Sequence, residues 1–217
     1  MIPRELGDHA TRPVRFVTLD FETATCDSAS ACALGVVVVE RSRIIRRRRW
    51  LMRPPHRHFE FTYVHGITWS MVANEPTFAE LWPEVRSEMD GAQFLAAHNA
   101  SFDREVLQAC CRRAGVRPPG LRFLCTVQLA RRAWGVYPTK LPNVCEFLGI
   151  DLDHHEALSD AEACARIVVA AGRAHVWAEL GQHPRPARSV ARMKQARRRP
   201  PSGFGRLRER GMCKELR

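Results

Sequence analysis

Three strand-like segments follow one another near the start of the chain, before any segment with helical periodicity appears. Residues 14–21 and 33–40 are apolar and rich in β-branched side chains, and residues 43–52 follow after only two residues. Short strand patterns return at residues 93–97 and 123–126, each after a helical segment. Consecutive strands joined by a short turn run antiparallel, whereas strands joined through a helix run parallel by a right-handed crossover. The order therefore predicts an α/β fold. Its mixed five-stranded sheet combines a three-strand antiparallel meander with parallel strands, and helices cover both faces.

Helical segments are expected at residues 77–90, 101–114, 127–134, 141–148 and 158–180. The first opens on a capping-box pattern, Thr77-Phe78-Ala79-Glu80. The stretch after Pro54-Pro55, through residue 68, shows no period and is expected to be irregular. The domain is predicted to span residues 14–180. Residues 1–13 form a flexible leader, and residues 181–217, rich in Pro and Arg, form a basic, disordered tail.

Positive charge is concentrated at the C-terminal end. The net charge is +11, and residues 181–217 carry twelve Lys or Arg and two Glu, so they account for +10. Such a segment attracts polyanions without sequence preference, although it can also serve only to keep the chain in solution. A second basic run, Arg46 to Arg49, lies on the third strand. It either protects a sheet edge from pairing or contacts phosphates, and both interpretations stay open.

No run of about 18 apolar residues is present, so we expect no membrane span. The first 15 residues lack the apolar region of a secretory signal. A cytoplasmic location is the default expectation.

Two carboxylates end the first strand. Asp20 and Glu22 are two residues apart, so both face the same side of the sheet, while Phe21 points into the core. Ligands of open α/β sheets bind beyond the carboxyl ends of strands. Paired carboxylates at such a place favour a hard divalent cation, because their desolvation is otherwise costly. The simpler alternative is a solvated strand end.

Two further acids and a histidine occupy helix starts. Asp103 lies in the first turn of the helix at residues 101–114, where it would also suit the helix dipole. Asp160 lies in the first turn of the last helix, and His155 precedes it by five residues. An imidazole titrates near neutrality, which suits a general base, and His154 is its immediate competitor. Four carboxylates and a base are the set that two-metal phosphodiester hydrolysis requires.

The three motifs resemble those of the DEDDh exonucleases, the group that contains the proofreading epsilon subunit of bacterial DNA polymerase III and oligoribonuclease. They are Asp20-Phe21-Glu22-Thr23, His98-Asn99-x-x-Phe102-Asp103 and His155-x-Ala157-x-x-Asp160. The resemblance covers about residues 14–178. The five-residue step of the third motif selects His155 over His154.

This resemblance implies a ribonuclease H-like fold and a metal-dependent 3′→5′ exonuclease that releases nucleoside 5′-monophosphates. Two Mg²⁺ or Mn²⁺ ions would be held by four carboxylates, and His155 would take the proton from the attacking water. The metal ligands would be Asp20, Glu22, Asp103 and Asp160. The 3′-terminal nucleotide would be seated by Phe21, Thr23, His98, Asn99 and Phe102, although Asn99 also suits a turn cap and Phe102 core packing.

DNA 3′ ends are the leading substrate. A 3′→5′ exoribonuclease on short RNA is the alternative within enzymes, because contacts to the 2′-OH are not visible in the motifs. A non-catalytic nucleic-acid-binding module is the alternative from another class, and the complete set of carboxylates argues against it. A polymerase partner is compatible with the motifs, but nothing in the sequence indicates one.

Overall fold

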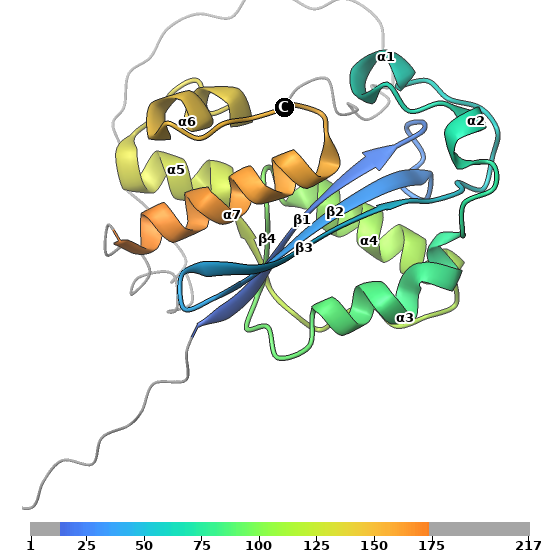
Figure 1. The fold of residues 1–217 in the computed structure, drawn as a ribbon, viewed down its shortest axis with the longest axis horizontal. Coiled ribbons are helices and arrows are strands. Elements are labelled where there is room, and N and C mark those ends of the chain that lie inside the picture. Colours follow the sequence, from blue (N-terminus) through green and yellow to red (C-terminus); the bar gives the residue numbers. More distant parts are fainter. Residues whose placement is uncertain (1–13, 174–217) are drawn as a thin grey trace, which may run out of the picture.

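The computed structural model describes residues 14–173 and is built on one mixed sheet (Figure 1). Its strand order is β3-β2-β1-β4-β5. The pairs β1–β2 and β2–β3 are antiparallel, and the pairs β1–β4 and β4–β5 are parallel. The predicted sheet is confirmed. The strands are β1 (Arg15–Thr23), β2 (Ala31–Glu40), β3 (Arg43–Leu51), β4 (Leu95–Ala97) and β5 (Phe123–Cys125).

The expected helices are present, and their ends differ from the prediction by at most two residues, except that the last helix is described only as far as Arg173. They are α3 (Phe78–Glu88), α4 (Ser101–Arg113), α5 (Thr126–Trp134), α6 (Leu141–Leu148) and α7 (Ala157–Arg173). The capping box that opens α3 is formed, since Thr77 Oγ1 accepts from the Glu80 N–H and the Glu80 carboxylate accepts from the Thr77 N–H. The expected leader, the basic tail and residues 174–180 lie outside the described residues.

The stretch after residue 53 differs from the prediction. The one-turn helix α1 (Thr62–His65) interrupts the chain that was expected to be irregular, and a second one-turn helix, α2 (Trp69–Val72), follows it where no element was predicted. They lie near the carboxyl end of β1 (Figure 1), where the N–H groups of Glu60 and Phe61 donate to Ala24 O. Helices of four residues carry too little periodicity to be recognised in a sequence.

Helices cover both faces of the sheet, as predicted (Figure 1). Alternate residues of β1 divide between the two resulting cores because successive side chains of a strand point to opposite faces. Val17, Leu19 and Phe21 pack with α3 and α4. On the other face Phe16 packs with residues of β2, α5 and α7. One face of β1 therefore points at α7, and the site is built there.

The basic edge strand is bound to acids of both helical layers. Arg46 and Arg48 contact Glu88 of α3 at 3.1 and 3.4 Å, and Glu88 is only 2% exposed. The alternate arginines, Arg47 and Arg49, point to the α7 side of the sheet and form ion pairs there. The two residues of the β2–β3 turn have φ values of 51° and 62°, as in a type I′ hairpin, which confirms the predicted short turn. Within residues 14–173 no helix is long and apolar enough to cross a membrane.

Candidate active site

The face of β1 that points at α7 becomes polar toward its carboxyl end. Phe16 packs against α7, and the hydroxyl of Thr18, the next residue on that face, donates to Ala161 O at 2.7 Å. Asp20 and Glu22 continue the same row. Pleating alone thus places both carboxylates beside the first turns of α7.

Three carboxylates meet there. Asp20, Glu22 and Asp160 are 1%, 0% and 2% exposed, and their ligand oxygens all lie within 4.8 Å of one another. Ionised carboxylates so close together and so well buried repel each other and are costly to desolvate. An oxygen-only, anionic donor set of this kind fits a hard divalent cation such as Mg²⁺ or Mn²⁺.

Asp103 takes a different position from the other three acids. It is fully buried in the first turn of α4, and its Oδ1 accepts the backbone N–H of Phe21 at 3.1 Å. This contact holds Asp103 against β1 between Asp20 and Glu22, although it lies outside the three-carboxylate group. Asp20, Asp160 and Asp103 all act on one buried thiol, that of Cys164. Its pKa is raised well above the usual value, first by burial and then by these three carboxylates.

Both histidines before α7 contact Asp160. The Nδ1 of His154 lies 3.1 Å from Asp160 Oδ2, and the backbone N–H of His155 donates to the same oxygen at 3.2 Å. The two rings stack with centroids 3.8 Å apart. His155 has a φ of 71°, a left-handed conformation that few residues other than glycine adopt. The structure thus places His155 at the site, as its motif predicts, and also brings the ring of His154 to Asp160.

The candidate substrate residues of the first motif are buried. Phe21 is 0% exposed and belongs to the core on the α3 and α4 side. Thr23 is 2% exposed, and its carbonyl lies 3.1 Å from Nε2 of His65. That contact joins α1 to the end of β1. Phe21 therefore supports the site through the core on the opposite face of the sheet, and Thr23 supports it through the contact with α1.

His98 is held on both sides of its ring. It is 2% exposed, its Nδ1 lies 2.8 Å from Thr126 Oγ1, and its Nε2 lies 3.1 Å from Thr139 O. The ring therefore links the end of β4 to the start of α5 and to the loop before α6.

Asn99 and Phe102 flank the start of α4. Asn99 has a φ of 56°, and its side-chain oxygen accepts from the Ser101 hydroxyl at 3.2 Å. Its side chain does not cap α4, because the N-cap residue is Ala100 and no side chain accepts a backbone N–H there. Phe102 is partly buried and packs against the core, which matches the packing alternative.

One residue that shapes the site was not identified from sequence. Gly35 of β2 lies opposite Asp20, and a Cβ at this position would lie 2.1 Å from Ala157 O, at the start of α7. A glycine within the apolar run of β2 is the signal that could have found it, because such glycines often mark a close approach of two backbones.

The RNase_T exonuclease family model matches residues 17–168. Exodeoxyribonuclease 10 of Escherichia coli K12 is 31% identical over 158 residues, which cover 68% of this chain and 65% of that protein. A PolC-type DNA polymerase III of Thermotoga maritima is 28% identical over 169 residues, which cover 76% of this chain but 12% of the polymerase.

Among solved structures, the nuclease domain of 3′hExo, a DEDDh family member bound to rAMP, shares the fold. It is 22% identical with a TM-score of 0.64, and the match covers 75% of this chain and 94% of that domain. The family model includes the sheet and all three motifs. The chain therefore belongs to the exonuclease family, as its resemblance to the DEDDh group predicted.

Proposed function

We propose that this chain is a metal-dependent 3′→5′ exonuclease that acts on DNA. The observation that carries the proposal is the meeting of Asp20, Glu22 and Asp160, three buried carboxylates from two distant parts of the chain, within 4.8 Å. Exodeoxyribonuclease 10, whose name states a DNA substrate, supports DNA over RNA.

In this proposal Asp20, Glu22 and Asp160 would hold one divalent ion, and Asp20 and Asp103 would hold a second. When bound, the ions would neutralise charge at the phosphodiester and lower the pKa of a water. His155 accepts the proton of the attacking water. The water oxygen bonds to the terminal phosphorus while the bond to the 3′ oxygen of the preceding nucleotide breaks. Protonation of that oxygen leaves a shortened strand with a free 3′-OH and a nucleoside 5′-monophosphate.

The immediate surroundings of the site suit this chemistry. Asp160 is oriented by the His155 N–H and by the ring of His154, and Asp103 is oriented by the backbone of β1. Groups fixed in this way need little rearrangement when the substrate reacts.

An exoribonuclease acting on short RNA is the second candidate. The structure of 3′hExo carries rAMP, which is the observation that favours it. A non-catalytic binding module has no such support, since it would not need the buried carboxylates.

The test offers three 5′-labelled substrates, single-stranded DNA, duplex DNA and short RNA, with Mg²⁺, Mn²⁺ or a chelator. We expect shortening from the 3′ end only with a metal, and fastest on DNA. Asp20→Asn should abolish turnover and leave the circular dichroism spectrum unchanged. A folded Asp20→Asn protein with normal turnover would contradict the mechanism, and faster RNA degradation would favour the second candidate.

A further inference from the structure

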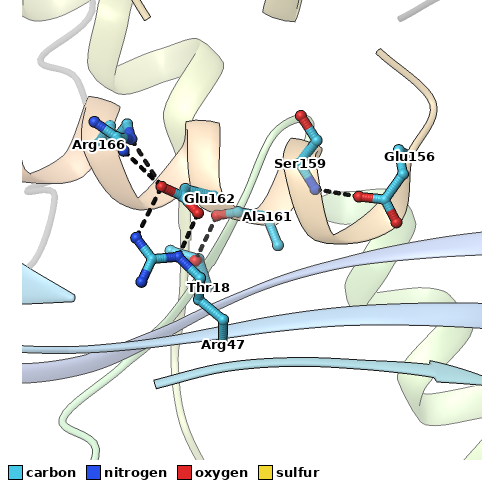
Figure 2. A network of polar contacts seen from close by, with 7 residues as sticks. All are labelled: Thr18, Arg47, Glu156, Ser159, Ala161, Glu162 and Arg166. Carbon is cyan, nitrogen blue, oxygen red and sulfur yellow. Dashed lines mark hydrogen bonds and ion pairs between the residues drawn. The ribbon is translucent and has the colours of Figure 1, made fainter. Parts of the chain in front are cut away.

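One ion pair connects the basic edge strand β3 to the start of α7, where the candidate active site lies. Of the arginines of this strand, Arg47 and Arg49 face α7, and each meets a carboxylate near the start of that helix. Arg47 Nε lies 2.5 Å from Glu162, and Arg49 Nε lies 2.7 Å from Glu156. Figure 2 shows the first of these pairs, in which Glu162 also accepts from Arg166 one turn further along α7.

Glu156 joins this strand to the first turn of α7. One of its carboxylate oxygens contacts Arg49, and the other accepts the Ser159 N–H at 2.7 Å, as an N-cap side chain does (Figure 2). Its carbonyl accepts the Asp160 N–H at 2.9 Å. Glu156 also directly follows His155. A shift of Glu156 would therefore move the candidate base and a candidate metal ligand together.

The sheet beneath this turn explains why the contact matters. Asp20, Gly35 and Arg49 are register partners on β1, β2 and β3, so they form one row across the α7 face. The start of α7 lies directly over the middle of the row, because a Cβ at Gly35 would be 2.1 Å from Ala157 O. On one side of the turn Asp160 meets Asp20, and on the other side Glu156 meets Arg49.

We propose that Arg49 is a positioning residue, which holds the first turn of α7 through Glu156 and so sets the place of Asp160 and His155 relative to the carboxylates of β1. This inference rests on the proposed function. Arg49 and Glu156 are 40% and 32% exposed, and an ion pair this exposed adds little to stability. Its effect on catalysis is larger, because a misplacement of about 1 Å can lower a rate by about 10²-fold.

The competing interpretation is that Arg49 contacts the phosphates of the substrate. The two roles differ in what they change. A positioning residue alters kcat, whereas a phosphate contact alters the KM for the oligonucleotide and the dependence of binding on salt.

The test measures kcat, KM and the salt dependence of binding on one DNA oligonucleotide for Arg49→Ala, Arg49→Lys and Glu156→Gln. Arg46→Ala is the matched control, because it removes the same charge from the same strand but on the opposite face. We expect Arg49→Ala and Glu156→Gln each to lower kcat by about tenfold or more, with KM and salt slope close to wild type. Arg49→Lys should restore part of the rate. The double variant should lose no more than either single one, because both changes break the same contact.

Two kinetic results would overturn the proposal. One is a raised KM and a shallower salt slope with unchanged kcat in Arg49→Ala, which would identify a phosphate contact. The other is an equal loss of kcat in Arg46→Ala, which would show a general effect of charge.

Amide hydrogen exchange provides a readout that does not depend on activity. Exchange at residues 156–160 should be faster in Arg49→Ala than in wild type and unchanged in Arg46→Ala. If the wild type has no nuclease activity, the proposed function fails, while the exchange result still tests the positioning. Unchanged amide exchange at residues 156–160 in Arg49→Ala would refute the positioning role of Arg49.

Discussion

Replacing Gly35 by alanine tests how closely α7 must lie on the sheet. The new Cβ would be 2.1 Å from the oxygen and 2.3 Å from the carbon of the Ala157 carbonyl, and 2.6 Å from Cα of Leu158. All three atoms are backbone, so no side chain can rotate away to make room. The start of α7 therefore has to move as a unit.

The size of that movement follows from the distances. An ordinary contact begins near 3.4 Å, so the closest pair has to separate by about 1.3 Å. Overpacking of this kind costs about 1–3 kcal/mol, and the backbone clash places Gly35→Ala at the upper end. At about 2–4 °C per kcal/mol for a chain of this size, the melting temperature should fall by roughly 6–12 °C. A shift near 1 Å at Asp160 and His155 should also lower kcat by about 100-fold.

The assay combines thermal unfolding followed by circular dichroism with kcat measured at saturating Mg²⁺, well below the melting temperature of the variant. Gly120→Ala is the matched control, because a Cβ at Gly120 meets nothing within 4 Å. That control should keep the wild-type melting temperature and rate. If Gly35→Ala melts and turns over like Gly120→Ala, then α7 does not need its close approach to β2, and the reasoning is wrong.

Three further predictions concern the base, the tail and acid stability. His155→Ala should lower kcat by about 10²–10⁴-fold, as loss of a general base does, and by more than His154→Ala; rate measurements at saturating substrate would show the reverse order if the motif register is wrong. Removing residues 181–217 should leave turnover of dinucleotides unchanged and make the salt dependence of binding to a long single strand shallower, by about 0.7 in log–log slope per lost phosphate contact; equal slopes would show that the tail does not bind. The hydrogen bond from Arg47 lowers the pKa of Glu162 from 4.5 to about 2, so its stabilisation is complete above pH 4.5 and is lost as the pH falls toward 2. Glu162→Gln should therefore lose less stability than wild type between these pH values. If the unfolding free energies of the two proteins, measured in urea, changed in parallel with pH, the pairing of Glu162 with Arg47 would be contradicted.

Local patterns predicted the fold well. The apolar run of β2, the capping box of α3 and the two-residue turn at Arg41 each act over a few residues, so they can be read from the sequence directly. The same holds for the pairing of Asp20 with Glu22 on one face, because the period of a strand is two. The one-turn helices α1 and α2 escaped prediction, since four residues hold no period.

Contacts between distant parts of the chain could not be obtained in this way. The sequence left open whether the arginines of β3 protect a sheet edge or contact phosphates. In the structure Arg47 and Arg49 form ion pairs with acids more than 100 residues away, and only the packing of α7 on the sheet brings them together. Similarly, spacing selects His155 over His154, yet it cannot show that the ring of His154 turns toward Asp160. The left-handed backbone at His155 could not be predicted either, because histidine does not require that conformation.

The two faces of β1 make this strand sensitive to changes in its length. Val17, Leu19 and Phe21 fill the core under α3 and α4. On the other face, Phe16 and Thr18 contact α7, and Asp20 and Glu22 supply the carboxylates. One residue inserted between Phe16 and Thr18 would turn Asp20 and Glu22 toward the core and Phe21 toward the site. Substitutions along this strand can accumulate one at a time, but a single insertion or deletion removes fold and site together. Surface loops in general tolerate insertions, whereas the length of this strand is expected to be fixed.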